Sequence, residues 1–505
     1  MLINIIRGSR VGPRLTNQAT VSIVKRQGNS TFSTTTARCA VAAKPATPSK
    51  LDSADADMWK AYANKMKSAY FPNMDTNSEA FYVAPIGRIG IPSGPGIAAE
   101  ITNKGVYDCA DPMPSLTSGV FGSSVDSFSQ RSQLYLGAVR LNRNPDKGAL
   151  YRLQQAKAKV DKLVSSKTEL EKSARAAFGE DEDKGTTTFK QWVPQNFPNL
   201  QSLYQELQAA SSTVASLTAQ VEGPGADQLN RYKTNVYNAL DLTTSYSGLN
   251  MPVVDLPADK MGDGTLPEGA AKIFRPTYSI SSTYADTVEN WIGQAGSQDH
   301  VDASITYDLA SAKSSKWSDV GISEWSAGAN AGYGFFQARF TVNGKEVVEQ
   351  ISASQAGSEL SVKVSATGIA SFEVKPGAWA VPGMEKSYPV LESQNAATFG
   401  AAGRVTDVVM GYKVGMSISM STKTKERVHE LTSKAISSGG SVSIFGFRLP
   451  FGGAGAGSFS HKTELDQMFV DKDKFGMNIP GLDVNYPVLL GVKATKVPEI
   501  KAKRV

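Results

Sequence analysis

The sequence predicts an α+β protein, in which an antiparallel helix pair and a third helix precede an antiparallel β-rich domain of the sandwich or barrel type. Two observations predict this fold class. Apolar residues recur at helical spacing through residues 149–240, and from about residue 270 the apolar period shortens to two. Turn-forming dipeptides such as Asn343-Gly344 and Pro376-Gly377 punctuate the second region, as expected where antiparallel strands reverse direction.

Composition divides the chain into four parts. They are a basic leader with a linker (1–50), a Gly/Pro-rich mixed segment (51–148), a helical segment (149–245) and a β-rich domain (270–498). The 505 residues are enough to bury substantial cores. The sequence contains no run of eighteen apolar residues, so it predicts no membrane-spanning helix.

The leader has the composition of an organellar transit peptide. Its first fifty residues hold eight basic residues and many Ser and Thr, and the first acidic residue is Asp52. A cation of this kind is drawn across a membrane whose inner side is negative, so we predict a mitochondrial protein with a removable leader. A basic tail on a cytoplasmic protein is the main alternative. Secretion is disfavoured because Arg7 interrupts the opening apolar run.

Charge argues against one class of partner, nucleic acids, and the cysteine content argues against an internal disulfide. Removal of residues through Arg38 would remove six positive charges and bring the formal charge from +6 to about zero. The remaining basic residues are scattered among carboxylates, so we expect no nucleic-acid partner. Cys39 lies at the leader boundary, and the mature chain would keep only Cys109, which cannot form an internal disulfide.

The mixed segment is expected to be largely irregular. A short amphipathic helix is predicted over residues 59–70, where Tyr62 and Met66 share one face. Short apolar runs at residues 81–83 and 134–136 are typical of strands.

The helical segment contains three predicted helices, over residues 149–178, 199–221 and 226–240. In each helix the apolar residues form one stripe among polar residues, as in coiled-coil packing. A connection of about twenty residues favours antiparallel pairing of the first two helices. The stripe containing Leu153 and Leu163 is expected to face the stripe of the second helix.

The β-rich domain contains several short alternating segments and one long one. Residues 361–366 and 372–375 alternate cleanly, and Asn343-Gly344 predicts a hairpin with a type I′ turn. The longest alternation covers residues 408–421 and is interrupted only at Val409. We expect a single strand there, then a helix over 425–436 and a second strand over 441–449.

No catalytic, cofactor-binding or metal-binding residue is assigned. Residues 94–99 match a dinucleotide fingerprint ending in Ala, but Pro95 crowds the turn and Gly105 would end the following helix early. Residues 452–457 lack the Lys-Ser/Thr ending of a phosphate loop. Residues 471–476 begin like a calcium loop, but Phe475 replaces an oxygen ligand and Leu482 stands where the closing Glu belongs. The chain has three histidines, His300, His429 and His461, without metal-ligand spacing, and Asp299-His300 is the least implausible acid–base pair.

These observations favour a non-enzymatic binding or assembly protein with no cofactor, which contacts a protein partner or other copies of itself. The first alternative is a membrane-inserting or pore-forming protein that uses residues 408–449, because a fourteen-residue alternating segment is long enough to cross a bilayer as a strand. An enzyme of unrecognised class is the second alternative. The first two hypotheses differ in whether the apolar face of 408–421 packs in a sheet or meets lipid.

Overall fold

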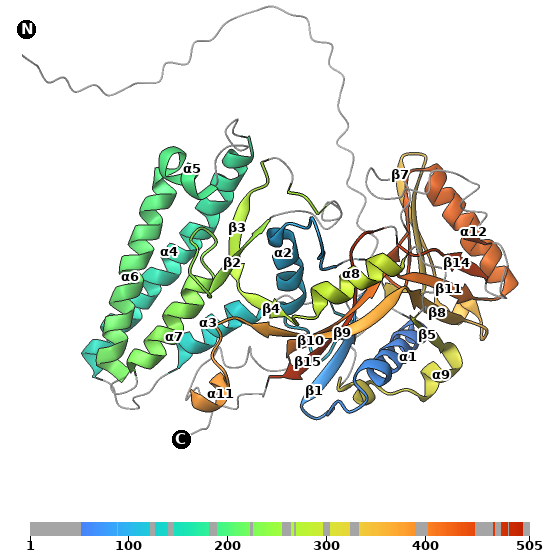
Figure 1. Ribbon diagram of the computed structural model, residues 1–505, viewed down its shortest axis with the longest axis horizontal. Coiled ribbons are helices and arrows are strands. Elements are labelled where there is room, and N and C mark those ends of the chain that lie inside the picture. The colour runs from blue at the N-terminus through green and yellow to red at the C-terminus, as the bar shows by residue number, and fades with distance from the viewer. Residues whose placement is uncertain are drawn as a thin grey trace, which may run out of the picture. The chain divides into compact units, whose positions relative to one another are not determined.

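The structure is a computed structural model of the chain (Figure 1). It describes residues 52–87, 89–121, 127–139, 146–180, 189–222, 226–254, 264–266, 269–295, 303–323, 333–388, 402–449, 468–469, 476–482 and 484–497. The predicted leader and the Gly-rich stretch at 452–457 lie outside these residues. The chain divides into two units, Met1–Thr47 and Pro48–Val505, and every described element belongs to the second.

The structure confirms the α+β class. The segment after the leader contains α1 (Ser53–Tyr70), β1 (Glu79–Val83), α2 (Ala99–Ala110) and α3 (Phe128–Ala138). Helix α1 begins earlier than predicted because Asp52 caps it, accepting a hydrogen bond from the backbone N–H of Ala54 at 2.9 Å. The prediction of a strand at residues 134–136 was wrong. These residues belong to α3, which Ser127 caps and which buries Tyr135 and Leu136.

The helical segment contains α4 (Lys147–Glu180), α5 (Phe189–Asn196), α6 (Pro198–Glu222) and α7 (Ala226–Ala239). The predicted antiparallel pair is confirmed by α4 and α6, which lie side by side (Figure 1). Leu153, near the start of α4, shares a small core with Val221 at the end of α6. Phe178, near the end of α4, packs in a second small core with Leu200 at the start of α6. The start of each helix therefore packs against the end of the other, as in an antiparallel pair.

Every described pairing between strands is antiparallel. The largest sheet has the order β1-β15-β10-β9-β4, and two four-stranded sheets have the orders β14-β11-β8-β5 and β13-β12-β6-β7. Strands β2 (Asn250–Val254) and β3 (Lys272–Pro276) form a separate pair. The remaining strands are β4 (Tyr278–Ile280), β5 (Ala303–Asp308), β6 (Phe336–Val342), β7 (Lys345–Ile351), β8 (Ser361–Ala366), β9 (Gly368–Pro376), β10 (Gly403–Tyr412), β11 (Gly415–Ser419), β12 (Ser441–Ile444), β13 (Phe447–Arg448), β14 (Met477–Ile479) and β15 (Val488–Lys496).

Helices also occur within the β-rich region. They are α8 (Tyr284–Gln294), α9 (Leu309–Ser314), α10 (Ala353–Ala356), α11 (Met384–Ser387) and α12 (Thr422–Ser437), with a 3-10 turn at Trp317–Val320. Helix α12 confirms the helix predicted over 425–436 and packs against β6 and β12. The predicted hairpin is also confirmed: β6 and β7 pair, and Asn343 and Gly344 have φ angles of 51° and 74°.

The two long strands predicted in this region are corrected. Residues 408–421 form the end of β10 and all of β11, which lie in different sheets. The break falls at Lys413, whose φ of 50° is left-handed and turns the chain out of the first sheet. Residues 441–449 form the hairpin β12–β13, which turns at Phe445 and Gly446 with positive φ angles.

The first helix and the first strand complete a core that the C-terminal half builds. Strand β1 pairs with the last strand, so that Phe81 lies opposite Lys493. Helix α1 packs against α9 and β5, and the indole N–H of Trp59 donates to the carbonyl of Tyr333 at 2.8 Å. One continuous apolar core therefore includes residues from Met58 to Val497.

Candidate functional site

The loop that matches the dinucleotide fingerprint does not form a nucleotide site. Strand β1, the nearest preceding strand, ends at Val83, so no strand leads directly into residues 94–99. Helix α2 has 12 residues. Gly105 lies against the backbone of Gly90, where a β-carbon would come within 2.6 Å of the Gly90 carbonyl oxygen. The glycine thus serves the packing of α2, and the loop lacks the strand–turn–helix frame of the fingerprint.

The histidine and metal motifs form no centre in the part of the chain that the structure describes. His429 lies on α12, and its ring packs against that of Phe469 in a T-shaped arrangement, with centroids 4.9 Å apart. His300, His461 and residues 471–475 of the calcium-like segment lie outside the described residues. Among those described, no group of three or more His, Cys, Asp or Glu side chains could hold a metal ion.

One buried carboxylate links distant elements in the core. Asp111, at the end of α2, is 1% exposed. Its Oδ1 accepts from the backbone N–H of Ser129 at 3.0 Å and from the hydroxyl of Tyr278 at 2.7 Å, and its Oδ2 accepts from the Ser129 hydroxyl at 3.0 Å. Burial, and then the charge of Asp111, raise the pKa of Tyr278 well above its ordinary value. The tyrosine therefore acts as a hydrogen-bond donor and not as a base.

A second buried carboxylate, Asp55, anchors the start of α1. Its Oδ1 accepts from the backbone N–H groups of Phe335 at 2.9 Å and Ala353 at 2.8 Å. Burial raises the pKa of Asp55 to about 6, against the opposing effect of these two hydrogen bonds. Sequence reasoning did not single out Asp55 or Asp111, because their partners are remote in the sequence.

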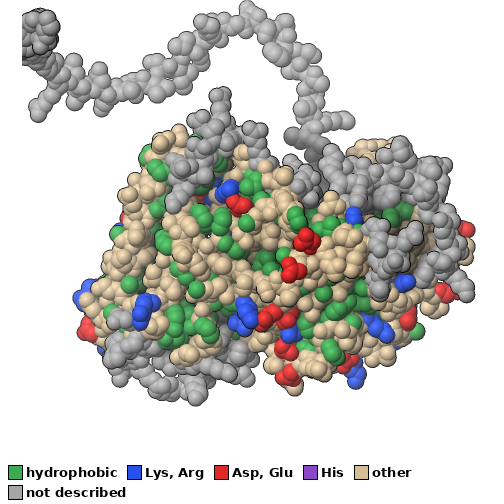
Figure 2. All heavy atoms as spheres, in the orientation of Figure 1, with side chains coloured by type: hydrophobic (Ala, Val, Ile, Leu, Met, Phe, Trp, Pro, Cys, Tyr) green, Lys and Arg blue, Asp and Glu red, His purple; other side chains and the backbone are tan. Residues whose placement is uncertain are grey.

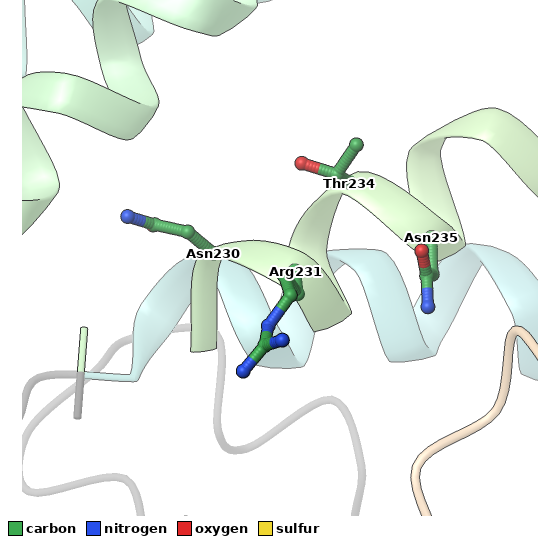
Figure 3. A pocket seen from close by; sticks show the side chains of 4 residues that line it. All are labelled: Asn230, Arg231, Thr234 and Asn235. Carbon is green, nitrogen blue, oxygen red and sulfur yellow. The ribbon is translucent and has the colours of Figure 1, made fainter. Parts of the chain in front are cut away.

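A shallow hollow of about 520 Å³ lies on α7 (Figure 3) and is lined by Asn230, Arg231, Thr234 and Asn235. The guanidinium of Arg231 donates to the Gln228 amide oxygen at 2.6 Å, and the Asn230 amide donates to the carbonyl of Ala215 at 2.9 Å. Arg231 and Asn235 point to the same side of the helix (Figure 3). The four side chains can hold a polar or anionic group, but they include neither a carboxylate nor an imidazole for proton transfer near neutral pH.

The outer edge of β7 is the other candidate contact surface. Strand β7 is the last strand of its four-stranded sheet, and no described strand pairs with its far side. Seven residues without proline form the strand. Val342 and Val348, both in the β6–β7 hairpin, are 47% and 42% exposed. We call this side of Lys345–Ile351 the β7 edge.

Charged side chains border both faces of the β7 edge. On the face nearer α12, the carboxylate of Glu349 pairs with the guanidinium of Arg427, which also binds Glu430 at 2.7 Å. On the other face, Arg339 and Glu346 approach to 3.6 Å. Ion pairs this exposed contribute little to stability. They orient charges at the edge rather than hold the sheet together.

Acidic and basic side chains are interspersed on the molecular face drawn in Figure 2. None of the helices that the structure describes combines the length and the apolar character needed to cross a membrane. Comparison of the chain with known protein families, curated proteins and solved structures found no match.

Proposed function

We propose that this chain is a non-enzymatic binding or assembly protein, which works inside a mitochondrion and contacts a protein partner through the β7 edge. The observation that carries the proposal is a seven-residue strand at the edge of a sheet, with Val348 exposed on it. An edge strand presents unpaired backbone N–H and C=O groups to an added strand, and proteins commonly use such edges for recognition. The acid-free leader supports the mitochondrial location.

The chemistry of the hollow on α7 agrees with a binding role. Its lining side chains bind polar groups without a base or nucleophile pair, and the carboxylates of Asp55 and Asp111 already accept hydrogen bonds from the fold. A small acidic group of a ligand or partner would suit Arg231 and Asn235.

The membrane-inserting alternative has less support. The side chains that would face lipid, from Val408 to Met420, are at most 7% exposed and pack in two different sheets. Insertion as one hairpin would require β10 and β11 to leave both sheets. That rearrangement would expose the core residues of each sheet to water.

The test replaces Val348 by Pro in the full-length protein. A two-residue turn at Asn343-Gly344 makes Val342 and Lys345 a hydrogen-bonded pair, so the backbone groups of Val348 point away from β6. Proline there removes an outward N–H donor without breaking the hairpin ladder. Val348→Ala is the matched control, because it removes the exposed side chain and keeps the donor.

The measurement is the size of the native complex containing each variant in a mitochondrial extract, with thermal unfolding as the check of folding. We expect the wild type in a complex larger than one chain, Val348→Pro largely released from it, and Val348→Ala mostly retained. A folded Val348→Pro protein that stays in the same complex would rule out the β7 edge as the contact. A wild-type protein that is monomeric in the extract would argue against the assembly role.

A further inference from the structure

We infer that the occupant of the β7 edge is a second copy of this chain, whose β7 pairs antiparallel with the first about a two-fold axis at Val347. The inference rests on the proposed function and names its partner. Along β7, residues whose backbone groups hydrogen-bond to β6 alternate with residues whose backbone groups point away from β6. The backbone groups of Glu346 and Val348 then point outward, where a second strand would pair with them.

Charge complementarity selects the register. With the axis at Val347, Lys345 of each copy lies opposite Glu349 of the other, and this contact occurs twice. These are positions without hydrogen bonds across the new interface, where facing side chains come closest. Opposite charges at such positions stabilise an antiparallel pair. Val347 faces its own symmetry mate, and Glu346 lies opposite Val348.

Other two-fold registers lack this match. An axis at Glu346 or at Glu349 would place that glutamate opposite its own copy, and facing like charges destabilise a strand pair. An axis at Val348 would place Lys345 opposite Ile351, without an ion pair. A strand whose own charges favour one symmetric register is suited to a copy of itself, because the same patch must serve on both subunits.

The neighbouring helix holds the acceptor in place. Arg427 of α12 pairs with the carboxylate of Glu349, with side-chain exposures of 44% and 35% respectively. Lys345 of the second copy would approach the same carboxylate from the edge, so that Glu349 would lie between two cations. Val348, which is 42% exposed, would lose water contact against the stem of Glu346.

The test is a charge swap in the full-length protein, read by analytical ultracentrifugation over a range of concentrations. Lys345→Glu places Glu opposite Glu349 in its own dimer, and Glu349→Lys places Lys opposite Lys345. Each should dimerise at least about tenfold more weakly than the wild type. An equimolar mixture of the two variants should dimerise again, because both contacts then join opposite charges. Restoration on mixing also shows that both variants are folded.

The control is Lys375→Glu in β9, which reverses an exposed strand lysine that pairs with Glu373 at 2.8 Å. It should dimerise like the wild type. Dimerisation unchanged in both charge variants, or not restored in their mixture, would overturn the register and with it this inference. A wild type that is monomeric when purified, but forms a larger complex in the extract that Val348→Pro disrupts, would overturn the self-pairing and leave the proposed function standing. If neither the dimer of the purified protein nor the complex in the extract depends on β7, both this inference and the proposed function are wrong.

Discussion

The Oδ1 atom of Asp55 lies 2.8 Å from the backbone nitrogen of Ala353, from which it accepts a hydrogen bond. The two residues are 298 positions apart in the sequence, and the same oxygen also accepts from Phe335. One carboxylate on the first described helix thus fixes the start of β6 and the start of α10. Because β6 belongs to the sheet that ends in β7, the position of the proposed contact edge depends on this anchor.

Replacing Asp55 by Ala should destabilise the protein strongly. Two buried N–H groups would lose their acceptor, and unsatisfied buried donors cost about 1–3 kcal/mol each. Asp55→Asn keeps an oxygen acceptor of the same shape and removes the buried charge, so at pH 7 we expect no loss of stability. Denaturant unfolding at pH 7 measures both variants. Equal losses for the two substitutions would show that these hydrogen bonds do not hold α1.

The raised pKa of Asp55 also predicts a pH dependence. The folded protein holds the proton up to a pKa of about 6, whereas the ordinary value is 3.8, so the protonated carboxyl stabilises the fold. This contribution, about 3 kcal/mol, is complete below about pH 4 and is lost as the pH rises through 6. The difference in unfolding free energy between the wild type and Asp55→Asn should therefore change across this window. Parallel stability curves for the two proteins would contradict the shift.

The helix pair offers a graded test of burial. Leu153 on α4 is fully buried and packs with Val221, and its replacement by Ala should cost about 2–4 kcal/mol. Leu163 lies on the same stripe but is half-buried, so Leu163→Ala should cost roughly half as much. Urea unfolding with a probe specific for the helical segment compares them. A larger loss at Leu163 would mean that the two stripes meet in a different way.

The leader prediction can be checked on the native protein. We expect the mature N-terminus between Arg38 and Lys50, upstream of Asp52, whose carboxylate caps α1 and accepts from the hydroxyl of Ser354 at 2.6 Å. N-terminal sequencing of the protein from its organelle decides the position. A variant that lacks residues 1–50 should stay in the cytosol and unfold at the same temperature as the mature form. An intact Met1 together with diffuse cytosolic staining would contradict the leader.

Local patterns predicted local structure well. Asn343-Gly344 predicted the β6–β7 hairpin because a type I′ turn depends on two adjacent residues. The helical stripes predicted α4 and α6, because the spacing of apolar residues along a helix is also a local property of the sequence. The prediction of one long strand was wrong because the apolar alternation continues across Lys413. This non-glycine residue takes a left-handed conformation that depends on the packing around it and not on the local pattern. Val409, the one break in the pattern, is fully buried because β10 is covered on both faces.

The partners of the buried carboxylates and the identity of the edge strands could not be predicted from the sequence. Asp111 and its partner Tyr278 are 167 positions apart, and no spacing rule connects them. The pairing of β1 with β15 joins the two ends of the described chain and depends on which strand edges remain open after the other strands pair. For the same reason β7 could be predicted as a strand but not as an edge. Strand order is a property of the whole fold.

The last prediction concerns Val414, which separates the binding or assembly hypothesis from the membrane-inserting alternative. Val414 has no exposed surface, its carbonyl accepts from the N–H of Leu482 at 3.0 Å, and it lies in the connection between β10 and β11. Val414→Asp would bury a charge without a partner, so we expect the protein to unfold or to lose several kcal/mol of stability, on the order of 3–5. Ser417→Asp in β11, three residues further along the chain, is the matched control. Ser417 is partly exposed and its hydroxyl donates to the Asn478 amide oxygen at 2.9 Å on the exposed face, so the change should cost less than about 1 kcal/mol. Thermal unfolding and dye leakage from liposomes are measured on both variants and on the wild type. A well-folded Val414→Asp protein would contradict the buried position, and wild-type leakage that this variant abolishes while keeping its fold would favour the membrane-inserting alternative.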